Sequence, residues 1–499
     1  MSKKFNQYID EYQNVHIQDK VLGKGGQGVV FRTKDPDLAI KLVIDETGKP
    51  VTDKASLEEY ARRFKLVHLL PLPEKLNISV PAALLRNNAG YVMQLLSEMV
   101  PFKHFWSDDK LAGNITNKDI PLWLSEMPEN EAKKIVYYYK TGGLRRRLTA
   151  LYKCASLLAR LHGNGFVYGD ISPNNIFISE GLEDSSVWLI DADNIRFETK
   201  KAGGAVFTPK YGAPELVQGK DGGRPTSDCY SFAIVAFYLL SLIHPFVGKK
   251  ADGTGKDDWA YCENDDEDSE EKAYAGLLPW VDDRDDDSNS SNSGLPRPLL
   301  LTEKLRSLFE RTFGEGRLSP WLRPSIYHWP AALAQASDLT VACAGCCMTY
   351  YYDYKDQETG EEKCPYCSVP KPPIIILESY RWNGVGEPLG KPCWRYVREI
   401  NNTSKLSIPS RVFGDFTMSD SDTEEVIIEF PLGKGILIKK SDQWKIDLYI
   451  ALENHQQNNF QKVYSQLKID RSNSELSFWM FACSNSPRLI LCSISGGAK

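Results

Sequence analysis

The chain has 499 residues, which is room for about three domains at ~150 residues each. Hydrophobic residues make up 42% of it and charged residues 25%, as in ordinary globular proteins. The formal net charge is −6, but residues 263–287 hold 12 acidic and 2 basic side chains, a local −10 that leaves +4 for the rest. No strongly basic tract remains, so the composition argues against nucleic-acid binding.

The start of the chain, its longest apolar run and its cysteines bear on where the protein works. Residues 1–7 lead into polar sequence without the apolar segment of a secretory signal. The run 229–243 is short for a membrane span and contains two serines, so we expect a buried core helix there. The 11 cysteines include two Cys-x-x-Cys pairs, which favour metal binding in a reducing compartment. We therefore expect a cytoplasmic protein with no membrane span.

A glycine-rich turn lies between two apolar stretches near the start. Gly23, Gly25 and Gly28 have the spacing G-x-G-x-x-G, and Val30 follows two residues later. Because glycine lacks a Cβ, such a turn lets the backbone approach phosphates. A strand follows the glycines, which excludes the dinucleotide-binding fold, since that fold needs a helix at this point. A plain hairpin with a flexible tip fits the motif equally well.

The next strand, 38–43, carries Lys41 among apolar residues. A lysine here is either a solvated surface residue or a cation directed into a site, and its place after the glycine turn favours contact with phosphate. Residues 55–70 have apolar residues at three- and four-residue steps, which predicts a helix. Either Glu58 or Glu59 of that helix is expected to pair with Lys41, with Glu59 slightly favoured. An exposed helix carboxylate explains the other one.

The strongest chemical pattern lies in residues 168–177, Tyr-Gly-Asp-Ile-Ser-Pro-Asn-Asn-Ile-Phe, and 189–193, Leu-Ile-Asp-Ala-Asp. Asp170 is followed by Asn175 five residues on and by Asp191 behind an apolar strand. In metal-assisted phosphoryl transfer one carboxylate orients the attacking hydroxyl, while an asparagine and a second aspartate hold Mg²⁺ against the nucleotide phosphates. These three residues are predicted to take those parts. A polar turn between two strands is the alternative.

Residues of about 15–335 resemble a eukaryotic-type protein kinase domain, because several short motifs occur in the order of that family. The motifs are Gly23-x-Gly25-x-x-Gly28-x-Val30, Ala39-Ile40-Lys41, Asp170 to Asn175, Asp191, Ala213-Pro214-Glu215, Asp228, His244-Pro245-Phe246 and Arg323-Pro324. The resemblance implies an α+β fold with a β-rich N-lobe at about 15–96, a helical C-lobe at about 97–335 and ATP between them.

The resemblance also implies roles for single residues. Met93 would be the gatekeeper, Asp228 would anchor the catalytic loop, and Glu215 would pair with Arg323. His162 would be a buried scaffold histidine. The catalytic residues would be Asp170, Lys41, Asn175 and Asp191. The nucleotide and its Mg²⁺ would contact Gly23, Gly25, Gly28, Val30, Ala39, Lys41, Glu59, Gln94, Leu96, Asn175 and Asp191.

Three departures from the family pattern leave alternatives open. Tyr168-Gly169-Asp170 replaces His-Arg-Asp and lacks the arginine that grips a phosphorylated activation loop. Ser172 replaces a lysine, and Asp191-Ala192-Asp193 replaces Asp-Phe-Gly. The Tyr-Gly-Asp loop is similar to the His-Gly-Asp loop of kinases acting on antibiotics, sugars or lipopolysaccharide, so a small-molecule kinase is one alternative. Ala213-Pro214-Glu215, preceded by Thr208, favours a protein substrate. A pseudokinase scaffold is a third hypothesis, although it needs none of the four catalytic residues.

Residues 251–296 interrupt the kinase pattern with Asp, Glu, Ser, Asn and Gly. Such a segment has little apolar surface to bury, so a flexible surface insertion is predicted. A docking segment for a basic partner is the alternative.

Two cysteine pairs follow the kinase-like region. Cys343-x-x-Cys346 and Cys364-x-x-Cys367 are separated by 17 residues, which matches the spacing of four-cysteine zinc sites. Four thiolates close a tetrahedron around Zn²⁺ and leave no open position, so a structural zinc ribbon is predicted at 340–370. A redox centre is less consistent with two matched pairs. Cys347 is a second candidate beside Cys346, and the symmetry of the pairs favours Cys346.

Residues 374–499 alternate β-rich runs with turn signals, which predicts a small sandwich or barrel. The runs are 394–400, 426–430, 435–439, 445–452, 478–482 and 489–494. Ile-Pro-Ser-Arg at 408–411 resembles part of phosphopeptide-binding sandwich domains, which indicates a partner-binding domain. A kinase followed by a zinc ribbon is similar to bacterial kinases associated with a von Willebrand A-type protein and a metal-dependent serine/threonine phosphatase. That architecture implies these two proteins as substrate and antagonist.

Overall fold

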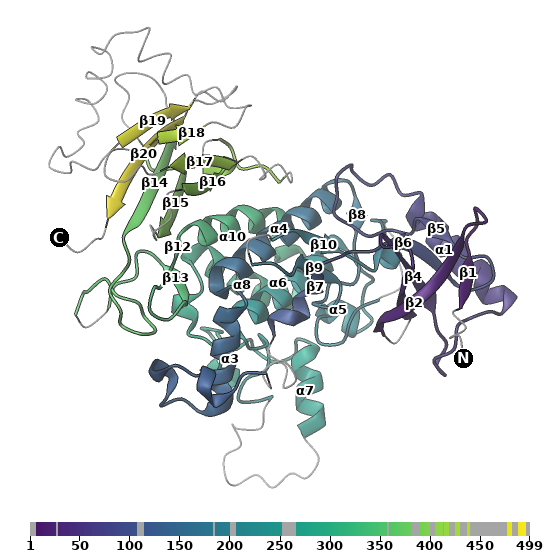
Figure 1. Ribbon diagram of the computed structural model, residues 1–499. Helices are drawn as coiled ribbons and strands as arrows, with labels where there is room; N and C mark the ends of the chain where they lie inside the picture. Colours follow the sequence, from purple (N-terminus) through teal and green to yellow (C-terminus); the bar gives the residue numbers. More distant parts are fainter. Residues whose placement is uncertain are drawn as a thin grey trace, which may run out of the picture. The chain divides into compact units, whose positions relative to one another are not determined.

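The computed structural model forms two compact units (Figure 1). The first contains Met1–Trp106, Lys153–Gly294 and Arg306–Trp329, and the second contains Ser107–Tyr152, Leu295–Leu305 and Pro330–Lys499. The structure describes residues 6–25, 28–106, 114–182, 185–199, 206–251, 266–356, 359–381, 390–399, 405–412, 414–418, 425–429, 437–439, 477–481 and 488–495.

The N-terminal part of the first unit is a six-stranded antiparallel sheet. Its strands follow the order β1-β2-β3-β4-β6-β5, and their bounds are β1 Gln7–Ile9, β2 Val15–Lys24, β3 Gly28–Thr33, β4 Leu38–Val43, β5 Ala83–Leu84 and β6 Gly90–Gln94. Side chains alternate across the strands, so Phe31, Ile40 and Val92 pack together on one face. The β-rich N-lobe predicted from the motifs fits this sheet.

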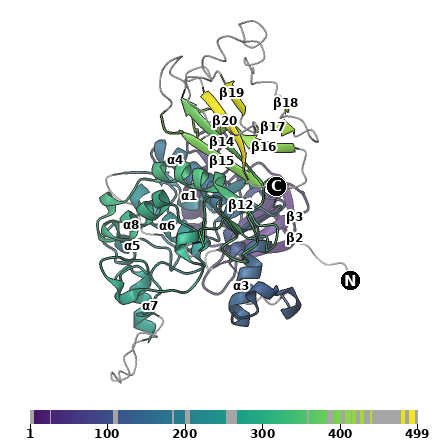
Figure 2. The same cartoon turned by 90° about the vertical axis from the view of Figure 1, so that its left-hand side faces the viewer.

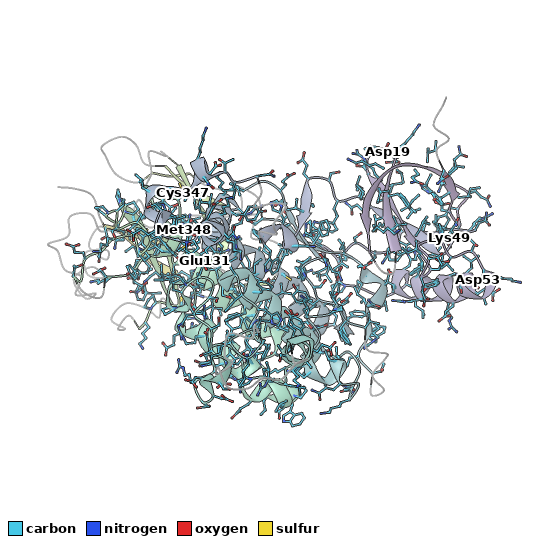
Figure 3. All side chains as sticks on the ribbon, turned by 90° about the horizontal axis from the view of Figure 1, so that it is seen from below. Asp19, Lys49, Asp53, Glu131, Cys347 and Met348 are labelled. Carbon is cyan, nitrogen blue, oxygen red and sulfur yellow. The ribbon has the colours of Figure 1, made fainter. Side chains whose placement is uncertain are left out.

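Helix α1, Lys54–His68, packs on the other face of the sheet. It begins at Asp53, an exposed N-cap residue whose side chain accepts a hydrogen bond from the Ser56 amide (Figure 3). Phe64 is buried on its inner side and contacts Tyr91 of β6 edge to face, with ring centroids 4.9 Å apart. The helix is therefore fixed to the sheet by an aromatic contact, and its opposite side faces solvent.

The remaining elements of the first unit are helices and short antiparallel pairs. The sheets are β10-β9-β7 and β11-β8, with β7 Met99–Pro101, β8 Phe166–Val167, β9 Ile176–Ser179, β10 Val187–Leu189 and β11 Arg196–Phe197. The helices that lie wholly or partly in this unit are α4 Gly143–Gly163, α5 Pro214–Val217, α6 Pro225–Ser241, α7 Asp266–Tyr274, α8 Glu303–Phe313, α9 Glu315–Leu318 and α10 Trp329–Asp338. A helical lobe beside a sheet fits a kinase-like α+β fold with two lobes.

Helix α6 contains the apolar run that the sequence analysis singled out, and nearly all of its side chains are buried. A helix that is apolar all round belongs to a protein core or a membrane, and length distinguishes the two cases. No helix in the described parts of the chain is both long enough and apolar enough to span a bilayer. The prediction of a buried core helix is confirmed.

The structure differs from the expected flexible insertion at 251–296. Residues 252–265 lie outside the described part, but Trp280 and Val281 are buried. The Trp280 ring contacts Phe237 of α6, with centroids 5.9 Å apart. The side-chain amide of Asn289, which is fully buried, donates to the carbonyl oxygens of Phe246 and Pro279 at 3.0 and 2.8 Å. A few apolar and amide side chains therefore anchor residues 266–296. The average composition of the segment does not indicate these contacts.

The second unit contains helix α3, Glu129–Lys140, and three groups of strands. A hairpin pairs β12 Thr340–Ala342 with β13 Thr349–Tyr351. A four-stranded sheet has the order β15-β14-β20-β19, and its strands lie side by side in Figure 2. Their bounds are β14 Ile374–Arg381, β15 Trp394–Glu399, β19 Ser477–Phe481 and β20 Arg488–Ser495. A three-stranded sheet joins β16 Lys405–Pro409, β17 Glu425–Glu429 and β18 Leu437–Lys439.

Five of the six runs named in the C-terminal part coincide with strands, and the sixth, 445–452, lies outside the described residues. The closure of these strands into a sandwich or barrel stays a prediction. In this unit the fully buried Asp338 carboxylate pairs with the Arg411 guanidinium at 2.7 Å and accepts from the Trp394 indole at 2.9 Å. A buried carboxylate needs such partners to offset the loss of its hydration.

Candidate functional site

Lys41 lies on β4 between two residues of the apolar core, and it points to the other face of the sheet. Its ammonium contacts two carboxylates that follow β10, Asp191 Oδ1 and Asp193 Oδ2, the second at 2.6 Å. The Lys41 side chain is only 9% exposed. The sequence analysis expected Lys41 and Asp191 to meet, and the structure brings them into contact from positions 150 residues apart.

The two carboxylates keep Lys41 charged. Burial lowers the pKa of Lys41, but the negative charges of Asp191 and Asp193 outweigh it and raise the pKa above its usual value. The Tyr91 hydroxyl donates to Asp193 Oδ1 at 2.7 Å, and burial together with these carboxylates raises the pKa of Tyr91 well above its usual range. At neutral pH the cluster therefore holds an ammonium ion and a neutral phenol that donates a hydrogen bond.

The expected pairing of Lys41 with Glu59 differs from what the structure shows. Glu59 is exposed, and Glu58 lies 4.0 Å from the exposed Lys54. Both glutamates occupy the solvent side of α1, because Phe64 and Val67 fix the opposite side against the sheet. Asp193, not Glu59, is the second carboxylate that pairs with Lys41, and reasoning from the sequence missed it. A second carboxylate two residues after Asp191 was the available signal.

Asp170 and Asn175 lie next to one another in the loop between β8 and β9. The Asn175 side-chain amide donates to the Asp170 carbonyl oxygen at 3.0 Å and to its Oδ2 at 3.1 Å. The Asn175 carbonyl oxygen accepts from the Ile190 amide at 2.9 Å, which ties this loop to the segment that carries Asp191. The Thr208 hydroxyl donates to Asp170 Oδ1 at 2.7 Å. Burial raises the pKa of Asp170, and the bond from Thr208 opposes that shift.

Asp228 holds the start of this loop from helix α6. Its two carboxylate oxygens accept from the amides of Tyr168 and Gly169 at 2.8 and 3.0 Å, and one of them also contacts His162 Nε2 at 3.0 Å. The roles expected for Asp228 and His162 are confirmed. Gly169 has φ +91°, a conformation that a residue with a side chain adopts only with strain. The loop shape therefore requires glycine where the family has arginine.

A second ion pair fixes α5, which begins at Pro214 within the Ala213-Pro214-Glu215 motif. The Arg323 guanidinium donates to both carboxylate oxygens of Glu215, at 2.7 and 2.8 Å, and its side chain is 1% exposed. Two parallel bonds between planar groups give a defined geometry as well as stabilisation. The expected pair of Glu215 and Arg323 is confirmed.

The last glycine of the glycine-rich turn, Gly28, lies beside the strand that carries Lys41. A Cβ at Gly28 would come 2.8 Å from the Leu42 carbonyl oxygen and 3.4 Å from Cε of Lys41. A Cβ at Gly23 or Gly25 would meet nothing within 4 Å. Gly28 is thus required by close packing beside the lysine, while the other two glycines leave open space. Residues 26–27 lie outside the described part of the chain.

The remaining residues expected around a nucleotide lie on neighbouring strands. Val30 is the cross-strand partner of Lys41, and Ala39 is the partner of Met93. Gln94 ends β6, and Leu96 follows it, half-buried. These positions share one sheet, and their contact with ATP stays a prediction.

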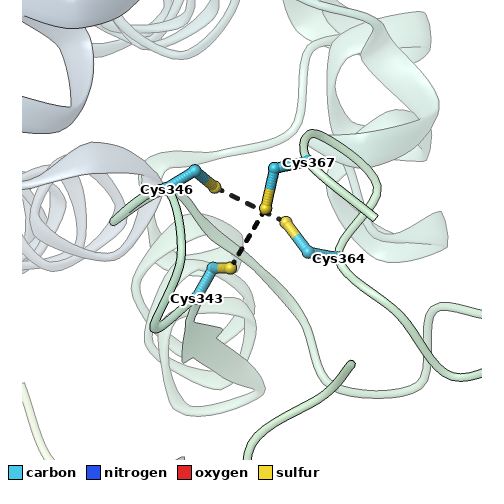
Figure 4. A group of neighbouring side chains, drawn as sticks. All are labelled: Cys343, Cys346, Cys364 and Cys367. Carbon is cyan, nitrogen blue, oxygen red and sulfur yellow. Dashed lines mark hydrogen bonds between the residues drawn. The ribbon is translucent and has the colours of Figure 1, made fainter. Parts of the chain in front are cut away.

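Four cysteines gather in the second unit, around the β12–β13 hairpin and the following turn (Figure 4). The Sγ atoms of Cys343, Cys346, Cys364 and Cys367 all lie within 4.8 Å of one another. Cys343 and Cys367 are 3.5 Å apart, and Cys346 and Cys364 are 3.6 Å apart. Cys347 is exposed and lies outside the cluster, beside the buried Met348 (Figure 3). The cluster thus contains Cys346 rather than Cys347, and its binding of zinc stays a prediction.

The cysteine cluster has the dimensions of a tetrahedral zinc site. With Zn–S bonds of about 2.3 Å, the sulfur atoms of such a site stand about 3.8 Å apart. The two turns have matching shapes, since Cys347 and Ser368, which directly follow the last cysteine of each pair, both have φ near +60°. The residues present therefore fit Zn²⁺ held by four thiolates, with no position left open for a reaction.

Comparison with known proteins gives matches to protein kinases. Residues 94–278 match the model of the protein kinase domain. The chain is similar to serine/threonine-protein kinase pkn2 of Myxococcus xanthus, 32% identical over 110 residues, covering 21% of this chain and 13% of that protein. It is 25% identical over 252 residues to serine/threonine-protein kinase PknD of Chlamydia pneumoniae, covering 46% and 24% of the two chains. It is 23% identical over 194 residues to the human cAMP-dependent protein kinase catalytic subunit PRKX, covering 38% and 49%.

These matches support the kinase part of the resemblance, at low identity. The range 94–278 contains Asp170, Asn175 and Asp191, while the glycine-rich turn and Lys41 precede it. The matched stretches span less than half of each of these three relatives.

Proposed function

We propose that this chain is a protein kinase that transfers the γ-phosphoryl group of ATP to a serine or threonine hydroxyl of a protein partner, with Mg²⁺ as cofactor. The observation that carries the proposal is the meeting of Lys41 with Asp191 beside the Asp170–Asn175 loop. Phosphoryl transfer depends mainly on positioning and on electrostatic stabilisation, and a cation, two acids and an amide supply both.

Each residue of this set has a distinct part. Lys41 binds phosphate oxygens, and its raised pKa keeps it charged at neutral pH. Asn175 and Asp191 would hold Mg²⁺, which supplies further positive charge beside the β- and γ-phosphates. Asp170 orients the substrate hydroxyl and accepts its proton. The bond from Thr208 fixes the Asp170 carboxylate at the place where that hydroxyl would enter.

The ordered Ala-Pro-Glu segment favours a protein substrate over a small molecule. Glu215 is held by Arg323, and Thr208, which precedes the motif, reaches the candidate base. This segment can support an extended peptide next to Asp170. By analogy of architecture we further propose a cytoplasmic protein of bacterial signalling, with a von Willebrand A-type protein as substrate and a phosphatase as antagonist. In this proposal Zn²⁺ stabilises the ribbon, and 374–499 binds a partner.

The test incubates the purified full chain with labelled ATP and Mg²⁺, beside the variants Asp191→Ala and Asp19→Ala. Asp19 is an exposed aspartate on β2 and serves as the matched control (Figure 3). We expect protein labelling in the wild type and the control, and a loss of about 10²- to 10³-fold in Asp191→Ala, because a positioned electrostatic group is removed. Equal labelling in all three, or nucleotide binding without transfer, contradicts the proposal. Transfer only to an aminoglycoside or a sugar would identify the small-molecule alternative.

A further inference from the structure

Asp193 uses both of its carboxylate oxygens inside the site. Oδ2 contacts the Lys41 ammonium at 2.6 Å, and Oδ1 accepts from the Tyr91 hydroxyl at 2.7 Å. Its side chain is 9% exposed, whereas that of Asp191 is 36% exposed. The two carboxylates that contact Lys41 therefore differ, because Asp191 is open to a ligand and Asp193 is fully engaged.

Helix α1 contacts the same segment through a different residue. Its Arg63 donates to the Asp193 carbonyl oxygen at 3.2 Å and to Asn194 Oδ1 at 2.6 Å. Helix α1 thus holds the backbone and the asparagine of the turn at 192–194. The glutamates of the helix face solvent. The position of Lys41 depends directly on that turn and on Tyr91.

A bound Mg²⁺ would compete with Lys41 for Asp191. In active kinases a lysine must remain paired with a carboxylate while another aspartate holds the metal. Here the second carboxylate lies two residues after the first, on the same turn. Both oxygens of Asp193 already have a partner, Lys41 and Tyr91, whereas Asp191 contacts Lys41 through Oδ1 and is more exposed, so Asp191 is the better placed of the two for the metal.

We propose that Asp193 is the positioning residue that holds Lys41 against the nucleotide phosphates when Asp191 turns to Mg²⁺. It takes the role that a glutamate of the N-lobe helix has in protein kinases. This inference rests on the proposed function and adds that the lysine is aligned by the metal-binding segment itself. Lys41 then needs no ion pair with α1.

The test compares Asp193→Asn, Tyr91→Phe and Glu59→Gln by steady-state kinetics with varied ATP. Asparagine keeps the shape of Asp193 and removes its charge, so we expect kcat/KM for ATP to fall by about 10²-fold. Tyr91→Phe removes one neutral hydrogen bond and is expected to cost about 2- to 10-fold. Glu59→Gln is expected to have an effect at least tenfold smaller than that of Asp193→Asn. Asp19→Asn is the matched control for the loss of an exposed charge.

Two readouts separate positioning from a general loss of structure. If Asp193 acts through Lys41, replacing Asp193 should cost little further activity once Lys41 is replaced, so Asp193→Asn and Lys41→Met should be strongly non-additive in a double-mutant cycle. Asp193→Glu keeps the charge and should restore part of the activity. A purely structural defect would lower the activity by the same factor with and without Lys41.

The result that overturns the inference is a large loss in Glu59→Gln with little change in Asp193→Asn, and it would leave the proposed function intact. If the wild type transfers no phosphoryl group, the proposed function fails. The inference is then decided by Mg-ATP binding, measured as the thermal shift that Mg-ATP produces in each variant. Weaker binding in Asp193→Asn than in Glu59→Gln would support the role of Asp193. Equal binding in the two variants, or none in the wild type, would refute it.

Discussion

The lysine–aspartate cluster and the four-cysteine cluster solve one electrostatic problem in different ways. Asp191 and Asp193 receive their counter-charge from the chain, because Lys41 lies between them. The four cysteine sulfur atoms lie within 4.8 Å of one another, and the backbone amides of Gly345 and Tyr366 donate to Cys343 and Cys364 at 3.3 and 3.5 Å. Four thiolates at that distance repel each other unless a cation joins them. The first site therefore has its counter-charge within the chain, and the second is expected to obtain it from a bound metal.

The largest effect is expected from breaking the cysteine cluster. We expect one zinc ion per chain, lost on Cys364→Ser or on chelation, with a marked drop in the melting temperature of the second unit. Structural zinc binding contributes an apparent free energy of about 10–16 kcal/mol in small zinc domains, so the hairpin at 340–370 should lose its order. Metal analysis and thermal melting measure the result.

The control for this prediction lies one residue from a ligand. Cys347 is exposed and outside the cluster, so Cys347→Ser should keep both the zinc and the melting temperature. Metal loss in Cys347→Ser as large as in Cys364→Ser, or freshly purified protein without metal, would refute the zinc ribbon and end the comparison between the two sites.

The second prediction removes the cation of the lysine–aspartate cluster. Lys41→Met leaves two neighbouring carboxylates without their counter-charge and should lower the free energy of unfolding by about 3–5 kcal/mol. The double variant Lys41→Met/Asp193→Asn should regain part of that loss, since it removes one of the stranded charges. Urea denaturation measures both. Lys54→Met is the control, because Lys54 is exposed and should contribute less than about 0.5 kcal/mol. A double variant no more stable than Lys41→Met would contradict the charge argument.

A third prediction concerns His244, a buried side chain that needs no counter-charge because it stays neutral at neutral pH. Burial lowers the pKa of His244 from 6.5 to about 4. Between these values the unfolded chain binds a proton that the folded protein does not, so stability falls as pH falls through this window. The loss should reach about 3 kcal/mol below the folded pKa.

His244→Gln should flatten this part of the stability profile, measured by urea denaturation at pH 7 and pH 4.5. His328→Gln is the control, because His328 is exposed. An equal slope in wild type and His244→Gln would show that other groups produce the pH dependence.

The smallest expected effect concerns Asp170, whose charge has no direct cation partner among its described contacts. Burial raises its pKa, and the hydrogen bond from Thr208 opposes that rise. Thr208→Val should therefore raise the pKa of Asp170 further and move the acid limb of kcat/KM to higher pH. Thr208→Ser keeps the hydroxyl and should leave the limb in place. A shift toward lower pH in Thr208→Val would contradict this account.

The sequence by itself determined the four cysteines of one cluster and Lys41 and Asp191 of the other, because these residues belong to short motifs. Two Cys-x-x-Cys pairs and the Asp170–Asn175–Asp191 pattern suffice to name candidate ligands, and the apolar run at 229–243 suffices to predict a buried helix. Each of these signals lies within a stretch of at most about 25 residues. The same reasoning predicted a flexible insertion at 251–296, because the average composition of the segment does not show that Trp280 and Asn289 are buried in the fold.

Only the tertiary structure decided which carboxylate holds Lys41. Both candidates are acidic residues close in sequence to a residue of the site, Glu59 to Lys41 and Asp193 to Asp191. The packing of Phe64 against Tyr91 rotates α1 so that its glutamates face water, and the turn after β10 brings Asp193 to the lysine. Lys41 and Asp193 are 152 positions apart, so no local sequence motif relates them. Its geometry follows from how a helix and a turn pack on a sheet, which is a property of the whole fold.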